Sequence, residues 1–244
     1  MAYPAALVLV GVAVFAGALL NSLSGFGFAL ITVPLMTIAV GPKDAVVLSA
    51  AVGLVSNSAV ALRNHSEIVR PVAARLLLGS LVGMPIGVLV LSRVADRTLE
   101  VMIALAVLLA AALLASGAKL SNPRPATDVG SGLLSGMFNT SIGISGPPVV
   151  MLLAGRGMPK AAFRATSVAV FCSAGVVAVA LFALAGRYDR SVLEAATVAL
   201  PALPLGFLIG DRVHRRVPEE RFRSLVLILM AATAVVTIGN AFAG

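Results

Sequence analysis

Apolar residues form long unbroken runs that short polar stretches separate. The first 42 residues have no charged side chain, and further uncharged runs cover residues 45–62, 76–92, 101–118, 129–155, 165–186, 195–210 and 224–244. About 20 apolar residues span a bilayer as an α-helix, and none of these runs has the polar face that a soluble helix needs. The pattern therefore predicts an all-α polytopic membrane protein.

The composition excludes a soluble protein. Hydrophobic residues make up 59% of the chain and charged residues 11%, against about 25% charged residues in an average soluble domain. The net charge of +8 is explained by basic loops that orient the helices in the membrane, so a lipid bilayer is the expected partner and nucleic acid is not. The chain has no Cys/His cluster and one cysteine, Cys172, so we expect no metal, no cofactor and no internal disulfide.

Three motifs recur in the same order at one separation. "NSLSGFGF" at residue 21 resembles "NTSIGISG" at residue 139, "GPKDA" at 41 resembles "MPKAA" at 158, and "MPIGVLVLSRV" at 84 resembles "LPLGFLIGDRV" at 203. The separations are 117 to 119 residues. This pattern predicts an internal duplication, which is common in secondary transporters.

The duplication divides the chain into a first transmembrane repeat (1–116), a polar linker (117–128) and a second repeat (129–244). Each repeat begins with an apolar segment interrupted by Gly, Ser and Asn, and continues with three spans. The predicted spans cover residues 44–62, 71–92 and 98–116 in the first repeat, and 160–186, 191–211 and 221–243 in the second.

The orientation of the repeats depends on the interrupted segments. If residues 129–155 cross the membrane once as a broken helix the repeats are parallel, and if they enter and return as a hairpin the repeats are inverted. Inversion places 13 Lys and Arg residues on one side and 5 on the other, whereas the parallel arrangement gives 11 and 7. The positive-inside rule favours inversion, with both termini outside and the Arg-rich loop 212–223 inside.

The interruptions themselves predict a binding site. Glycine and proline weaken a helix, and irregular backbone at membrane depth is tolerated where protein buries it or where it lines a wet cavity. A helix that begins at such a break presents unpaired N–H groups and the positive end of its dipole, which favour an anion. The predicted substrate-binding residues are Asn21, Ser24, Gly25, Phe26, Gly27, Phe28, Asn139, Thr140, Gly143, Ser145, Gly146, Pro147 and Thr166. Glycines elsewhere, such as Gly79, Gly83 and Gly87, are expected to allow close helix packing.

The placement of the acidic residues limits the function. Every Asp and Glu lies outside the middle of the apolar runs, so a buried cation site is disfavoured. The runs also hold no paired carboxylates, metal-ligand set or Ser/His/Asp set, which argues against an enzyme. Small anions are the favoured substrates, and the sequence does not distinguish a carrier from a passive channel.

Short motifs resemble the TauE/SafE sulfite exporter family. They are "VPLM" at residues 33–36, "SGPPVVMLL" at 145–153 and "FRATSVAV" at 163–170, and the resemblance extends over nearly the whole chain. It implies a secondary transporter in the bacterial cytoplasmic (inner) membrane that exports a small sulfur-containing oxyanion such as sulfite. Organosulfonates or small organic carboxylates are the alternative substrates, and a homodimer is compatible with the sequence, which does not fix the oligomeric state.

Overall fold

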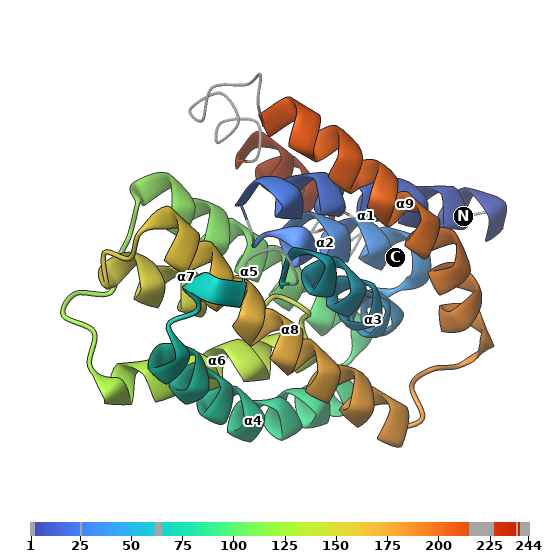
Figure 1. The fold of residues 1–244 in the computed structure, drawn as a ribbon. Coiled ribbons are helices and arrows are strands. Elements are labelled where there is room, and N and C mark those ends of the chain that lie inside the picture. The colour runs from blue at the N-terminus through green and yellow to red at the C-terminus, as the bar shows by residue number, and fades with distance from the viewer. Residues whose placement is uncertain (1–2, 25, 62–64, 215–226, 238, 240–244) are drawn as a thin grey trace.

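The structure is a computed structural model that describes residues 3–24, 26–61, 65–214, 227–237 and 239. Gly25 of the predicted site, most of the loop 212–223 and both ends of the last predicted span lie outside the described residues. The described part is helical and contains no strand, as the sequence predicts (Figure 1).

Long and short helices are interspersed along the described part of the chain. The first half contains α1 (Tyr3–Ser24), α2 (Phe28–Val40), α3 (Pro42–Ala61), the short 3-10 helix η1 (His65–Glu67), α4 (Arg70–Arg93) and α5 (Asp96–Ser116). The second half contains α6 (Pro125–Ser141), α7 (Gly146–Gly155), α8 (Lys160–Leu184), α9 (Arg190–His214) and the helix Leu227–Thr237. The predicted spans agree with α3, α4, α5, α8 and α9 to within a few residues, and α6 begins inside the predicted linker.

Local sequence explains where several helices begin and end. Prolines occupy the first turns of α3, α4 and α6, where a missing N–H group costs no helical hydrogen bond. Gly117 ends α5 with a φ of 64°, a left-handed conformation that glycine adopts without steric cost.

Six described helices are long and apolar enough to cross a membrane: α1, α3, α4, α5, α8 and α9. The helices α2, α7 and Leu227–Thr237 are apolar but shorter. α2 has 13 residues and therefore extends about 20 Å, less than the hydrocarbon thickness of about 30 Å. The chain is thus a multi-pass membrane protein in which short helices supplement the full spans.

Both interrupted segments fold as hairpins rather than as single broken helices. Thr32 of α2 donates a hydrogen bond to the Ala13 carbonyl of α1 at 3.3 Å, and Gly17 lies against Phe28, so α2 runs back along α1. In the second half Ser135 contacts the Ser145 carbonyl, and the Leu120 N–H group just before α6 donates to Met151 of α7. In each segment the second helix therefore runs back along the first.

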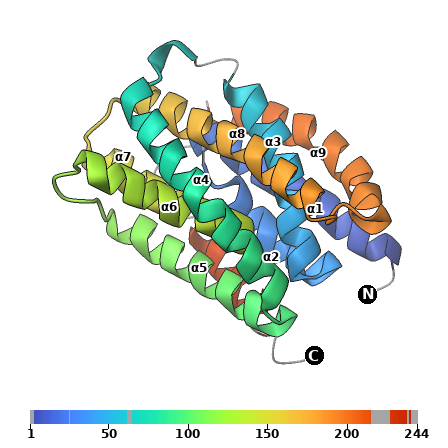
Figure 2. The same cartoon turned by 90° about the horizontal axis from the view of Figure 1, so that it is seen from below.

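Two helix pairs with close backbone contact join the halves. Gly79, Gly83 and Gly87 of α4 lie directly on the backbone of α6, and Gly206 and Gly210 of α9 lie in the same way on α1. Figure 1 shows these two pairs on opposite sides of the molecule with α3 and α8 between them, and Figure 2 shows α3 and α8 from below. Glycine allows this packing because any side chain would separate the backbones.

The α4–α6 contact gives a stability prediction. A methyl group at Gly83 would overlap the Leu133 carbonyl oxygen, so Gly83→Ala should lower the apparent melting temperature of the detergent-solubilised protein by several degrees. Gly130 of α6 has open space around its Cβ position, so Gly130→Ala is the matched control. It should leave the melting temperature unchanged or raise it, because alanine favours a helix by about 1 kcal/mol over glycine. Equal effects of the two substitutions would contradict the packing role.

Candidate functional site

The first break lies between α1 and α2. Gly27 precedes α2 with a φ of 101°, in the left-handed region that side chains other than glycine rarely adopt. The Leu30 N–H group donates to the Gly27 carbonyl at 3.1 Å. The N–H groups of Phe28 and Ala29 have no acceptor within their own helix, because the first turn of any helix lacks one.

The second break lies between α6 and α7. Gly143 has a φ of 74° and lets the chain turn after α6 ends at Ser141. Ser135 donates to the Ser145 carbonyl at 2.8 Å and fixes the residue that precedes α7. Pro147 and Pro148 follow in the first turn of α7 and have no N–H group, so the donors at this helix start are Ser145 and Gly146.

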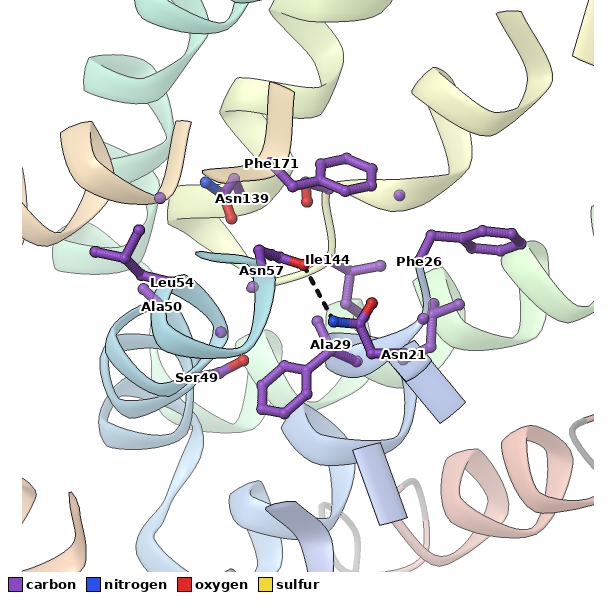
Figure 3. A pocket seen from close by; sticks show the side chains of 18 residues that line it. Asn21, Phe26, Ala29, Ser49, Ala50, Leu54, Asn57, Asn139, Ile144 and Phe171 are labelled. Atoms are coloured by element: carbon purple, nitrogen blue, oxygen red, sulfur yellow. Dashed lines mark hydrogen bonds between the residues drawn. The ribbon is translucent and has the colours of Figure 1, made fainter. Parts of the chain in front are cut away.

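The two breaks meet at one cavity. It has a volume of about 60 Å³, room for a few water molecules or one small ion. Residues from both breaks and from the middle of α3 and α8 line it (Figure 3). The lining consists of Asn21, Phe26, Gly27, Phe28, Ala29, Leu30, Ser49, Ala50, Gly53, Leu54, Asn57, Asn139, Gly143, Ile144, Ser145, Gly146, Phe171 and Gly175.

No side chain in this lining is ionisable. The favourable charge for an anion therefore comes from the two helix starts, each equivalent to about half a positive charge. The polar side chains at the cavity are Asn21, Ser49, Asn57, Asn139 and Ser145. The site can bind a small anion through neutral hydrogen-bond donors and two converging helix dipoles.

Asn21 belongs to a buried amide cluster at the edge of the cavity. Only 1% of Asn21 is exposed, and its Nδ2 donates to Ser56 Oγ at 2.9 Å and to Asn57 Oδ1 at 3.1 Å (Figure 3). Within the described residues, the Oδ1 atom of Asn21 is buried without a hydrogen-bond donor. Such an acceptor is rare in a folded protein.

The structure brings most of the predicted site residues together. Asn21, Phe26, Gly27, Phe28, Asn139, Gly143, Ser145 and Gly146 all line the cavity. Pro147 lies in α7 just beyond the lining. Gly25 and the side chain of Ser24 are outside the described part of the chain.

Two predicted threonines have structural partners elsewhere. Thr140 Oγ1 donates to the Met84 carbonyl at 2.7 Å and joins α6 to α4. Thr166 Oγ1 accepts a hydrogen bond from the Val69 N–H group at 3.0 Å and joins α8 to the start of α4. Neither residue lines the cavity, so both serve helix packing in this conformation.

For Ser49 and Asn57, polar residues within an apolar run, the sequence does not decide between bonding to a ligand and bonding to another helix, and it does not assign the other residues that α3 and α8 contribute. Ser49, Gly53 and Asn57 lie four residues apart on α3 and line the cavity together with Phe171 and Gly175 of α8. Small or polar residues at this spacing share one face of a helix. That spacing inside an apolar run is the signal by which the sequence could have revealed them.

Outside the cavity, a buried cluster of ion pairs fixes the hairpin formed by α6 and α7. Asp128 of α6 is completely buried and bonds Arg75 of α4 through its Oδ2 at 2.8 Å. Its Oδ1 bonds Arg156, which follows α7, at 2.6 Å. Removing one partner of a buried pair costs more than an exposed pair contributes, so this cluster fixes α6 and α7 against α4.

The helices define a polytopic membrane protein with a cavity between two helix breaks, an arrangement typical of secondary transporters. The family model described as Sulfite exporter TauE/SafE matches residues 9–237, so the chain belongs to the TauE/SafE family. Members of this family are membrane transporters, and the chain is a transporter rather than an enzyme.

Two curated proteins are similar to the chain. A probable sulfite/organosulfonate exporter from Cupriavidus necator is 30% identical over 213 residues, which cover 81% of this chain and 80% of that protein. A probable inner membrane transporter protein from Comamonas testosteroni is 34% identical over 107 residues, which cover 43% of this chain and 44% of that protein. No solved structure matches the chain.

Proposed function

We propose that this chain is a secondary transporter that exports a small sulfur-containing oxyanion, with sulfite as the leading substrate. The observation that supports this most directly is the cavity at which two helix starts and several neutral hydrogen-bond donors converge. The family and the name of the Cupriavidus protein agree with this cargo. The location that fits the relatives and the six apolar helices is the bacterial inner membrane.

The substrate is held near the membrane midplane. Ser49 to Asn57 lie in the middle of α3, and Phe171 and Gly175 lie in the middle of α8. Both helices are long enough to span the bilayer, so their central residues lie at about half its depth. Transporters built from repeats commonly bind their substrates at this depth, at discontinuous helices.

The membrane potential supports export. An anion that leaves a cell with a negative interior gains about 2.3 kcal/mol per 100 mV for each charge. A site without a fixed cation suits this task, since an arginine would bind an oxyanion through strong bidentate bonds and slow its release. Neutral hydrogen bonds each contribute only about 0.5–1.5 kcal/mol.

Organosulfonates are the second candidate substrates. The name of the Cupriavidus protein includes them, and Phe26, Leu54 and Phe171 give the cavity an apolar wall beside its polar donors. A small organic group attached to the sulfonate would lie against that wall. Small carboxylates are less well supported, because no relative described above is named for them.

The two halves form an inverted pair of repeats, residues 1–116 and 129–244. In this arrangement α3 corresponds to α8, and the two helices run in opposite directions: Ser58 contacts Cys172, whereas Leu54 contacts Gly175. If the halves are exchanged, α4 corresponds to α9 and α6 to α1, so the α4–α6 contact corresponds to the α9–α1 contact. A two-fold axis would relate the two contacts in this way. The hairpin form of both interrupted segments also supports inversion. A hairpin adds no net crossing of the membrane, so three crossings separate a position in the first half from its equivalent in the second, and an odd number of crossings gives the halves opposite orientations.

A flux assay tests the substrate. The purified chain in liposomes should transport sulfite well above the rate of protein-free liposomes. Thiosulfate, sulfate, sulfoacetate and acetate, assayed in parallel, define the range of substrates. Flux of acetate but of none of the sulfur compounds would contradict the proposed function.

Cysteine labelling tests the inversion. Lys43 and Lys160 lie at the starts of the antiparallel helices α3 and α8. In a background in which Cys172 is replaced by serine, Lys43→Cys and Lys160→Cys should react with a membrane-impermeant reagent from opposite sides of the membrane. Labelling of both positions from one side would show that the repeats are parallel.

Gly146→Leu tests the cavity. Gly146 lines it and has open space at its Cβ position, so a leucine side chain would occupy most of a volume of about 60 Å³. We expect sulfite flux to fall to the background of protein-free liposomes while the melting temperature stays close to that of the unmodified protein. Gly130→Leu, at an exposed position on α6, is the control and should transport normally. Undiminished flux in Gly146→Leu would place the substrate elsewhere.

A further inference from the structure

The two hairpins contribute side chains of very different size to the cavity at one equivalent position. Phe28 is the first residue of α2 and Gly146 is the first residue of α7, and the repeated motifs pair the same two residues. Both line the cavity, as do Asn21 and Asn139 at another equivalent pair of positions. The amides are thus matched between the halves, whereas a benzyl side chain in the first half is matched by a hydrogen atom in the second.

The ring of Phe28 is held between α1 and α3. A Cβ atom at Gly53 of α3 would lie 3.4 Å from Phe28 Cδ1, and a Cβ atom at Gly17 of α1 would lie 3.1 Å from Phe28 Cδ2. Opposite edges of the ring therefore face two glycines, and only 5% of Phe28 is exposed. Because glycine has no side chain, these two positions leave room for the ring beside the cavity.

The equivalent position in the second hairpin is unfilled. Within the described residues, no atom beyond its chain neighbours and its own helix lies within 4 Å of the place where a Gly146 Cβ would be. The free volume of about 60 Å³ is therefore bounded by an aromatic side chain at the start of α2, and no side chain bounds it at the start of α7. The size of the cavity depends on this difference between the halves.

We propose that Phe28 determines the largest anion that the cavity accepts. A buried site relaxes only partially when a large side chain is removed, so a smaller residue at this position would enlarge the cavity. With Phe28 in place, the cavity accepts sulfite and the shortest sulfonates and excludes sulfonates with longer chains. The inference rests on the proposed function and specifies the size of its substrates.

Straight-chain alkanesulfonates test the size limit, because methane-, ethane- and propanesulfonate carry the same charged group and differ only in length. Each is added as an inhibitor of sulfite flux in liposomes that contain the purified chain. In the unmodified protein the inhibition constant should rise by at least about tenfold from methanesulfonate to propanesulfonate, the discrimination that a pocket achieves against an extra methylene group. In Phe28→Ala this rise should nearly disappear, because the longer chain occupies the volume of the ring.

Two further substitutions make the test specific. Phe182 of α8 is fully buried and lies outside the cavity lining, so Phe182→Ala removes an equal ring and should retain the steep rise. Phe28→Leu removes less volume and should give an intermediate rise, also where alanine at this position lowers the amount of folded protein. The ratio of two inhibition constants from one preparation does not depend on that amount.

The outcomes separate this inference from the proposed function. Equal inhibition constants across the series in the unmodified protein, or an unchanged rise in both Phe28 variants, would overturn the size limit and leave the exporter function in place. Loss of the rise in Phe182→Ala as well would assign the effect to a general loosening of the core and would also overturn it. So would the absence of inhibition by all three sulfonates in both the unmodified protein and Phe28→Ala. Absence of sulfite flux in the unmodified protein, after subtraction of protein-free liposomes, would overturn the proposed function and this inference with it.

Discussion

The fold depends on the requirement that backbone N–H and C=O groups in hydrocarbon find partners. Continuous helices meet it within themselves, whereas α2 and α7 begin inside the protein with N–H groups that have no helical acceptor. Both helix starts are half-buried at Gly27 and Gly146, and they line one cavity together with residues of α3 and α8. In the proposed function an anion accepts hydrogen bonds from these N–H groups, so the conformational constraint and the proposed binding site have the same origin.

Close helix packing is what brings the two breaks together. Gly79, Gly83 and Gly87 let α4 approach the backbone of α6, and Gly206 and Gly210 do the same for α9 on α1. Each contact ties a hairpin of one half to a spanning helix of the other. In hydrocarbon, where apolar side chains gain little by leaving lipid, such van der Waals contact between backbones is a main source of helix association.

Ion pairs stabilise the protein outside the cavity lining. Asp128 is buried between Arg75 and Arg156, and Lys43 pairs with Asp96 at 2.9 Å where α3 and α5 begin. The cavity lining is left with amides, hydroxyls and backbone donors. Strong ion pairs thus form fixed contacts, and under the proposed function the transported anion is held by weaker neutral bonds.

The sequence by itself determined the all-α membrane architecture, the approximate spans and the positions of the two glycine-rich breaks, because hydropathy and glycine content act locally along the chain. It did not decide which polar residues within apolar runs face the cavity. Thr140 and Thr166 were expected there and instead bond Met84 and Val69, whereas Ser49 and Asn57 of α3 line the cavity. A polar side chain in hydrocarbon needs a partner in either case. Whether that partner is another helix or a ligand depends on which helices pack beside the polar residue. Those helices are distant in the sequence, as are Thr140 and Met84, 56 residues apart, and Thr166 and Val69, 97 residues apart, so only the folded protein decides it.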